Sequence, residues 1–262
     1  MKRITLILAF AMLAAFTSAA QEKPKTDGPK ADAPKTDTKA EALPTVDEIL
    51  TNNVKAVGGK EAIEKITSRS MKGSFDIEAM GVSGAAVEMV AKAPNKSAMK
   101  IDVPGFGMVN RIFDGATAWA SDPMSGLREL SGVELAQMKR ESDFYAELNY
   151  KNHYTKMEVK GKEKVGSYET YVIEATPAEG SPEKLYFDVN TGLLVRQDAE
   201  SESPQGKMPV EIHLSDYKDV GGVKIAHTLK QVNPMMTMVI KFSEVKTNDP
   251  ISDAKFNKPP GN

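Results

Sequence analysis

The chain has 262 residues, contains no cysteine and has a formal net charge of −2 at pH 7. The lack of cysteine excludes disulfides, thiolate metal sites and a cysteine nucleophile, so burial of apolar surface must stabilise the fold. No basic stretch is present that would neutralise phosphates, which argues against nucleic acid as a partner.

The first twenty residues have the three parts of a secretory signal peptide. Lys2 and Arg3 supply the positive start, residues 4–16 are almost entirely apolar, and small residues lead up to Ala20. The apolar run is shorter than the ~20 residues that span a bilayer. We therefore expect residues 1–20 to be removed and the mature chain, which has no transmembrane segment, to be periplasmic or secreted.

Residues 21–44 are predicted to form a disordered linker rich in Pro, Lys, Thr and Asp. A Pro-Lys-Xaa-Asp pattern starts at Pro24, Pro29 and Pro34. Such a segment buries too little apolar surface to offset the entropy of ordering, and its prolines favour extended conformations. A spacer role and a simple solvated leader both remain open.

Helical periodicity predicts where the ordered region begins. Thr45 and Glu48 have the spacing of a capping box, and the apolar residues that follow recur on one helical face. Gly58-Gly59 is expected to end this helix, and residues 60–66 predict a second short one.

From Met71 onward the apolar residues recur every second position, which is typical of strands with one buried face. Met71, Gly73, Phe75 and Ile77 form the first such series, and Asp114-Gly115 predicts a hairpin turn further on. Later alternating runs predict strands over 155–162, 169–175, 183–189, 193–200, 210–217, 223–232 and 235–245. The last run is apolar on both faces, so we expect it to be covered from both sides.

Residues 131–148 interrupt the strands with helical spacing. Leu135, Met138 and Tyr145 lie on one stripe, and Ser131 is in a position to cap the start. An amphipathic helix inserted in a sheet protein must bury this stripe on the apolar face of the sheet. We therefore expect it to act as a lid.

These elements predict a mainly β, α+β fold in a single domain over residues 45–248. One curved antiparallel sheet of about twelve strands forms a half-open barrel, with the N-terminal helices and the inserted lid helix in its mouth. Residues 249–262 are expected to form a polar C-terminal tail, in which Phe256 is a candidate to pack back.

No catalytic or metal-binding motif is present. His153 is expected in a solvated loop, and His213 and His227 are expected to be unrelated residues of neighbouring strands. Neither a nucleophile elbow nor a phosphate-binding glycine loop occurs. We therefore expect a protein that is not an enzyme and has no cofactor, no metal and no catalytic residues; a hydrolase with an unrecognised carboxylate pair ranks last.

Fourteen methionines are the more informative feature. Methionine suits surfaces that adapt to variable apolar shapes, although an ordinary methionine-rich core is also consistent with the pattern. A curved sheet with few aromatic side chains to fill it favours a cavity. The expected cavity wall is Phe75, Ile77, Met89, Met99, Ile101, Trp119, Met236 and Met238, and the expected lid contacts are Leu135, Met138 and Tyr145.

The order of elements and three hairpin segments resemble the periplasmic lipoprotein-carrier superfamily (LolA/LolB-like). These segments are Phe113-Asp114-Gly115 leading to Trp119, residues 186–193 (YFDVNTGL) and residues 217–223 (YKDVGGV). The resemblance implies a carrier that shelters acyl chains in a half-barrel under a helical lid. Known carriers latch this lid with an arginine, for which Arg69, Arg111, Arg128 and Arg140 are all candidates here.

We therefore expect a non-enzymatic binder or carrier of an apolar ligand in the cell envelope. The expected ligand is a lipid or the acyl chain of a lipoprotein, and an envelope protein is a possible partner. The alternative is an exported protein-interaction or assembly module with a filled core and no ligand.

Overall fold

The computed structural model describes residues 42–203 and 206–259. The expected signal peptide, residues 1–20, and all but the last three residues of the expected linker, residues 21–44, lie outside the described residues. Within the described ranges, no helix is both long and apolar enough to cross a membrane.

Two helices precede the sheet, as the sequence predicts. Helix α1, Val46–Val57, begins with the predicted capping box: the Thr45 hydroxyl accepts a hydrogen bond from the Glu48 backbone N–H at 3.2 Å, and the Glu48 carboxylate accepts one from the Thr45 N–H at 2.7 Å. Gly58 ends the helix at a φ of 134°, a conformation that favours glycine. Helix α2, Lys60–Lys65, follows at once.

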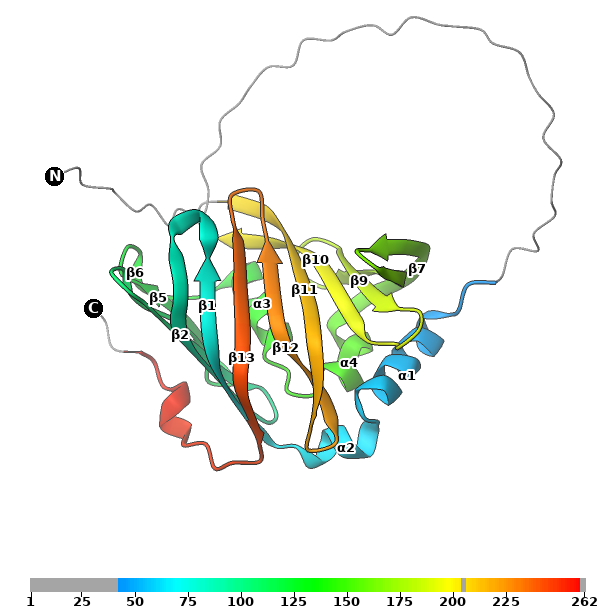
Figure 1. Cartoon of the computed structure of the whole chain (residues 1–262), viewed down its shortest axis with the longest axis horizontal. Helices are drawn as coiled ribbons and strands as arrows, with labels where there is room; N and C mark the ends of the chain where they lie inside the picture. Colours follow the sequence, from blue (N-terminus) through cyan, green and yellow to red (C-terminus); the bar gives the residue numbers. More distant parts are fainter. Residues whose placement is uncertain (1–41, 204–205, 260–262) are drawn as a thin grey trace, which may run out of the picture.

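The described residues form thirteen strands in one antiparallel sheet, whose order is β6-β5-β4-β3-β2-β1-β13-β12-β11-β10-β9-β8-β7 (Figure 1). Consecutive strands therefore pair with each other, except for β6 and β7, and β1 also pairs with β13, where the two halves of the chain meet. The strands are β1 Ser68–Ile77, β2 Val82–Lys92, β3 Lys96–Val103, β4 Gly107–Phe113, β5 Ala118–Asp122, β6 Gly126–Glu129, β7 Tyr154–Val165, β8 Tyr168–Pro177, β9 Glu183–Asp188, β10 Leu194–Ser203, β11 Gly206–Val220, β12 Val223–Val232 and β13 Thr237–Thr247.

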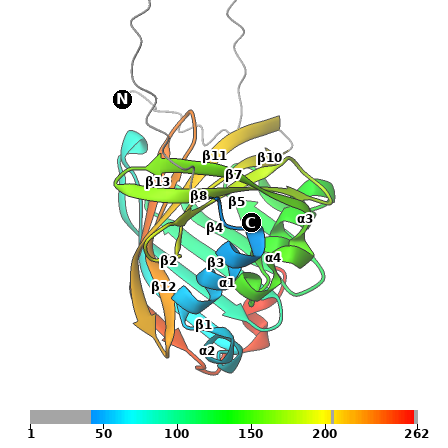
Figure 2. The ribbon, with the colours of Figure 1, turned by 90° about the vertical axis from the view of Figure 1, so that its right-hand side faces the viewer.

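The sheet curves but does not close, because β6 and β7 are its two ends. Figure 2 shows β7, β8, β10 and β11 arching over the space that faces β1 to β5, with α1 and a later helix, α4 (Ala146–His153), inside the curve. The expected half-open barrel with helices on its concave face is therefore confirmed. The α-helices that line the cavity described below therefore all lie on this one side of the sheet.

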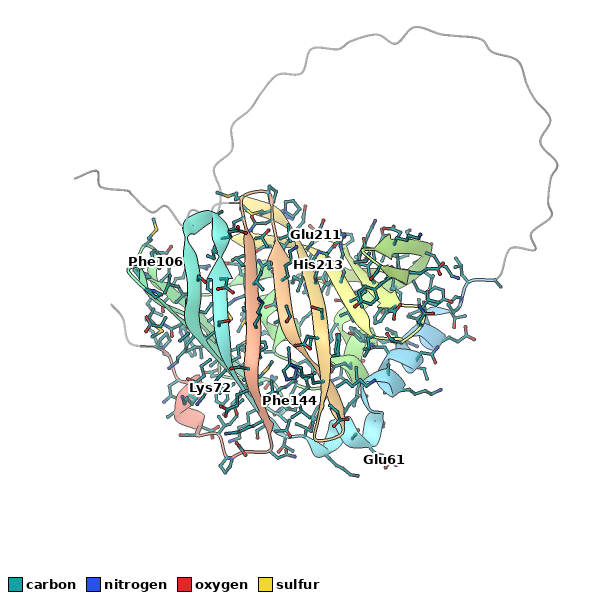
Figure 3. The ribbon with its side chains drawn as sticks, viewed as in Figure 1. Glu61, Lys72, Phe106, Phe144, Glu211 and His213 are labelled. Carbon is teal, nitrogen blue, oxygen red and sulfur yellow. The ribbon has the colours of Figure 1, made fainter. Side chains whose placement is uncertain are left out.

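Strand alternation assigns the predicted apolar series of β1 to the concave face. Phe75 and Ile77 are 6 % and 1 % exposed, whereas Lys72 is exposed on the outer face, which faces the viewer in Figure 3. The buried residues of this face form the largest core cluster: Met71, Phe75, Ile77, Ala85, Val87, Ile101, Val103, Ile225 and Phe242. Burying each such side chain stabilises the fold by about 1.5–3 kcal/mol, so this cluster supplies a large share of the stability.

The expectation that the last strand is covered from both sides is wrong. The pairing of β13 with β1 shifts by one residue between Lys72 and Gly73, so that Phe242 lies opposite Gly73 and Val245 lies opposite Met71. This bulge turns Val245 to the same concave face as Phe242. The outer face of β13 then presents polar residues such as Lys241 to solvent.

The single inserted helix expected over 131–148 is in fact two helices. Helix α3 spans Gly132–Glu141 and helix α4 spans Ala146–His153. Between them the Asp143 carboxylate accepts a hydrogen bond from the Tyr145 N–H at 2.9 Å, which is a local contact that competes with helix continuation. The helical period alone does not reveal this break, because the apolar stripe continues across it.

The C-terminal segment is not a free tail as far as residue 259. After β13 the chain forms a short 3-10 helix, η2, Asp253–Phe256, and the Phe256 ring is 1 % exposed. It packs on the outer face of the sheet against Ile112 and Trp119. A second 3-10 helix, η1, Glu78–Met80, connects β1 to β2.

We predict that Gly73→Ala destabilises the protein by about 2 kcal/mol. A Cβ atom at position 73 would overlap with the carbonyl oxygen of Lys241 at the bulge, and backbone cannot move aside as a side chain can. Urea unfolding measures the loss. Ser74→Ala on the same strand is the control, with an expected change within about 0.5 kcal/mol; equal unfolding midpoints for the two variants would contradict the prediction.

Candidate functional site

A cavity of about 400 Å³ lies between the concave face of the sheet and the helices α1, α3 and α4. Its volume is within the range of about 300–1,000 Å³ that is usual for small-molecule sites. The sheet contributes residues from β1 to β4 and from β10 to β12, so both halves of the chain form its wall. The described residues contain no group of three or more side chains that could hold a metal ion.

A row of methionines forms the apolar floor of the cavity. Met71 on β1 lies opposite Met89 on β2, which lies opposite Met99 on β3. Met138 of α3 lines the same cavity from the helix side. Because unbranched thioether side chains adapt to different apolar shapes, this floor suits a flexible hydrocarbon chain. The remaining apolar lining includes Val57, Leu194, Leu214, Ile225 and Leu229.

The sequence-predicted wall residues fall into two groups on the concave face. Met89 and Met99 line the cavity itself, as does the predicted lid residue Met138. The others except Trp119 lie in or against the packed core cluster beside it, where Phe75, Ile77 and Ile101 are buried and Met236 and Met238 are partly buried. The structure thus brings all of the predicted wall residues but Trp119 onto one face, and those in the core cluster fill the part of this face next to the cavity.

Trp119 does not line the concave wall as predicted. It pairs with Ile112, whereas the neighbouring Arg111 pairs with Met99 of the methionine floor. Neighbouring residues on a strand point to opposite faces, so Trp119 lies on the outer face, where Phe256 covers it. The alternation of side chains along the strand can be read from the sequence, but the packing of Phe256 over Trp119 cannot.

Two predicted lid contacts lie at the edges of the cavity. Leu135 of α3 packs against a cluster that includes Phe113 and Leu130. Tyr145 precedes α4 and its hydroxyl donates a hydrogen bond to the Ile66 carbonyl oxygen at 3.1 Å. Both side chains therefore attach the inserted helices to their surroundings, and neither lies over the methionine floor.

Two polar side chains line the cavity without having been predicted there: Arg69 was only one of four candidates for the lid latch, and Asn53 was not singled out. Arg69 lies two residues before Met71 on β1 and so extends the inward series by one step, which is a signal that the sequence contains. Burial lowers the pKa of the Arg69 guanidinium, and the charge of Glu147 opposes this shift. The guanidinium carbon lies 5.4 Å from the centre of the Phe144 ring, within the range of a cation–π contact.

Asn53 of α1 is the second missed residue. It is 1 % exposed, and its amide group donates a hydrogen bond to the Gly192 carbonyl oxygen at 2.9 Å. This bond identifies which end of the amide is the nitrogen. Its Oδ1 atom has no partner among the described residues, although buried polar atoms are rarely left unpaired.

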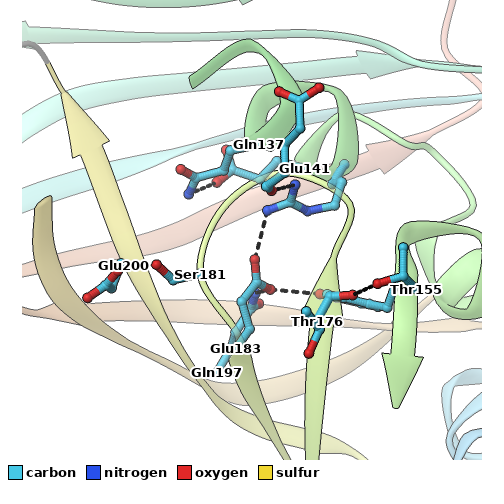
Figure 4. Close-up of polar contacts among 11 residues, drawn as sticks. Gln137, Glu141, Thr155, Thr176, Ser181, Glu183, Gln197 and Glu200 are labelled. Atoms are coloured by element: carbon cyan, nitrogen blue, oxygen red, sulfur yellow. Dashed lines mark hydrogen bonds and ion pairs between the residues drawn. The ribbon is translucent and has the colours of Figure 1, made fainter. Parts of the chain in front are cut away.

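The buried carboxylate of Glu183 attaches α3 to the sheet (Figure 4). It accepts hydrogen bonds from Arg140 of α3 at 2.8 Å, from the Tyr154 hydroxyl at 2.7 Å and from Gln197 at 2.9 Å. Burial and the negative charge of Glu183 raise the pKa of Tyr154 above its ordinary range, so this hydroxyl stays protonated and donates. Of the four candidate arginines, Arg140 is therefore the one that joins the inserted helices to the distant half of the sheet.

The junction between α3 and α4 is held by a second polar cluster. The Asp143 carboxylate accepts a hydrogen bond from Asn149 at 2.8 Å and lies 2.8 Å from the His153 Nε2 atom. The expectation that His153 is a solvated loop residue is wrong, because it ends α4 and its side chain is only 17 % exposed. The spacing of these residues in the sequence does not show that the Asp143 carboxylate contacts Asn149 and His153.

The other two histidines are unrelated, as predicted. In the β11–β12 pairing His213 lies opposite Lys230, and its ring contacts Glu211 at 3.1 Å. His227 is buried, and its Nδ1 atom lies 2.8 Å from the Ile225 carbonyl oxygen.

Solved structures with the same architecture include a member of the LolA superfamily. That protein, from Nitrosomonas europaea, matches with a TM-score of 0.53 and 13 % identity over 82 % of this chain and 99 % of its own. A putative outer membrane lipoprotein-sorting protein domain from Vibrio parahaemolyticus matches with a TM-score of 0.55 and 13 % identity, over 80 % and 95 %. A DUF1329 family protein from Desulfovibrio piger matches with a TM-score of 0.56 and 17 % identity, over 81 % and 97 %.

The chain therefore has a LolA-like fold, and the resemblance found in the sequence is confirmed at the level of fold. No model of a known protein family matches the sequence. No curated protein matches it either.

We predict that Glu183→Gln destabilises the protein by about 3 kcal/mol, because it leaves the partly buried Arg140 guanidinium without its counter-charge. Chemical unfolding measures the change. The control is Glu64→Gln, which breaks the exposed pair with Lys60 on α2 and should cost less than about 0.5 kcal/mol. Equal losses in the two variants would show that the Glu183 contacts do not anchor α3.

Proposed function

We propose that this chain is an exported, non-enzymatic binder or carrier of an apolar ligand in the cell envelope. The proposed ligand is a lipid, or the acyl chain of a lipoprotein, and the proposed location is the periplasm or the secreted fraction. The observation that supports this most directly is the methionine-floored cavity of about 400 Å³. The adjoining part of the same concave face is filled by core side chains, so the cavity is a local feature of the helix-covered half.

The energetics favour a hydrocarbon chain as the occupant. Each CH₂ group buried contributes about 0.8 kcal/mol, so a long acyl chain binds well without specific polar contacts. One of the proteins that share the fold is described as a putative outer membrane lipoprotein-sorting protein domain, and this supports an acyl chain as the ligand. A protein-interaction module with a filled core, the alternative from the sequence, would have no use for such a cavity.

Ala91→Trp is expected to abolish binding of a fluorescent fatty acid. Ala91 lies on β2 and lines the cavity, so an indole there occupies the volume proposed for the acyl chain. Ala86→Trp is the matched control, because Ala86 lies on the same strand, is exposed and faces outward. Fluorescence titration measures binding, and the unfolding temperature of each variant checks that it folds.

Native mass spectrometry of the gently purified protein gives an independent test. The proposal predicts copurified lipid in the unaltered protein and less of it in Ala91→Trp. If the unaltered protein contains no lipid and takes up no fatty acid, the proposal fails. Recovery of a specific envelope protein in a pull-down under those conditions would favour the interaction module instead.

A further inference from the structure

The Arg69 side chain places a positive charge in the cavity without a partner in the described protein. It makes no hydrogen bond or ion pair with the described residues, and its contacts there are the Phe144 ring and the more distant charge of Glu147. A charge removed from water is costly unless it is paired. The Arg69 guanidinium is therefore positioned to pair with an anion that the described protein does not supply.

The other candidate arginines show how unusual this is. Arg111 pairs with Glu141 at 3.1 Å, Arg128 with Glu134 at 2.7 Å, and Arg140 with Glu183 at 2.8 Å. Each of these three pairs joins the inserted helix α3 to a strand. The carboxylates of α3 are thus already paired with other arginines, and the Arg69 guanidinium remains free to pair with a ligand in the cavity.

The sheet leaves room beside Arg69. Arg69 lies opposite Ala91 on β2, and Ala91 lies opposite Ser97 on β3, so small side chains flank the guanidinium on this row. The next inward row, two residues along each strand and about 7 Å away, is the methionine floor that contains Met71. A charged row with free space therefore adjoins an apolar row with flexible side chains.

The unpaired Oδ1 atom of Asn53 is an independent observation at the same cavity. It is a hydrogen-bond acceptor that is almost completely buried and has no donor among the described residues. An acyl chain cannot satisfy it, whereas a hydroxyl or amide N–H group of a ligand can. Asn53 lines the cavity, so the lining contains a residue with an unpaired acceptor in addition to the Arg69 cation and the apolar floor.

We propose that the cavity takes an amphiphile with an anionic head group, whose carboxylate or phosphate pairs with Arg69 while its acyl chain lies on the methionine floor. A hydroxyl or amide N–H of the same ligand donates to Asn53 Oδ1. This deepens the proposed lipid-binding function and rests on it. Arginine suits both anions, because its planar guanidinium donates two parallel hydrogen bonds.

Glu147 provides a test of whether Arg69 serves a ligand or a carboxylate of the protein. Glu147 of α4 also lines the cavity, and its charge favours the charged form of Arg69. If Arg69 binds an anionic head group, Glu147 repels that group, and Glu147→Gln strengthens the binding of anionic ligands by several-fold. If Arg69 serves only as a partner of Glu147, the unaltered protein shows no preference for anionic over neutral ligands and a preference appears only in Glu147→Gln, and this outcome overturns the proposal.

Four palmitoyl ligands separate the two polar contacts by displacement of the neutral dye N-phenylnaphthylamine from the purified protein. Palmitate has an anion only, monopalmitoylglycerol has hydroxyl donors only, palmitoyl lysophosphatidate has both, and methyl palmitate has neither. A charge-assisted hydrogen bond predicts that palmitate binds about tenfold or more tightly than methyl palmitate. Inorganic phosphate alone is expected to displace nothing, and displacement by phosphate but not by palmitate would instead indicate a site for the free anion.

Arg69→Met should remove the preference for palmitate over methyl palmitate while methyl palmitate binds as before. Arg128→Met is the matched control and should keep the preference, because Arg128 does not line the cavity. Asn53→Leu should weaken only the two ligands with hydroxyl donors. An unchanged preference in Arg69→Met overturns the proposal, whereas failure of the unaltered protein to bind the dye or any of the four ligands sinks the lipid-binding function itself.

Discussion

The inserted helices are held over the concave face by contacts at their ends and edges, and this leaves space beneath them. Arg140 joins α3 to Glu183 of β9, and Asn53 joins α1 to the Gly192 turn. The Tyr150 ring of α4 meets the Phe187 ring of β9 edge to face, with their centres 6.1 Å apart. Arg111 of β4 and Arg128 of β6 hold α3 on the opposite side. The helices therefore bridge the concave face between two sets of anchors, and the methionine floor lines the cavity beneath them.

The position of the inserted helices over the sheet also determines which charges in the cavity are paired. A guanidinium that reached a carboxylate of α3 or α4 would be neutralised within the protein, as Arg111 and Arg128 are. Arg69 lies on the row next to the methionine floor and meets an aromatic ring instead. Its charge is therefore partly desolvated yet unpaired, which makes the head group of a ligand the natural counter-ion and explains how a cavity with an apolar floor could choose among lipids.

Much of the fold could be predicted because it depends on short-range signals. The capping box at Thr45, the glycine that ends α1 and the alternating series of β1 each act within a few residues. The site was less accessible to prediction, since it depends on which elements meet. The break at Asp143, the bulge opposite Gly73 and the position of Phe256 over Trp119 each require a partner far away in the sequence or a local contact that periodicity does not show.

By itself the sequence determined a mainly β chain whose inward rows are rich in methionine and whose strands are interrupted once by helices. It also contained Arg69 in register with the inward row, although nothing in the sequence distinguished it from the three other arginines. Only the tertiary structure decided which of the four found a carboxylate, because pairing depends on where α3 and α4 settle on the curved sheet. The physical reason is that a strand's alternation sets the direction of a side chain, whereas its partner is set by the packing of segments that are distant in the chain.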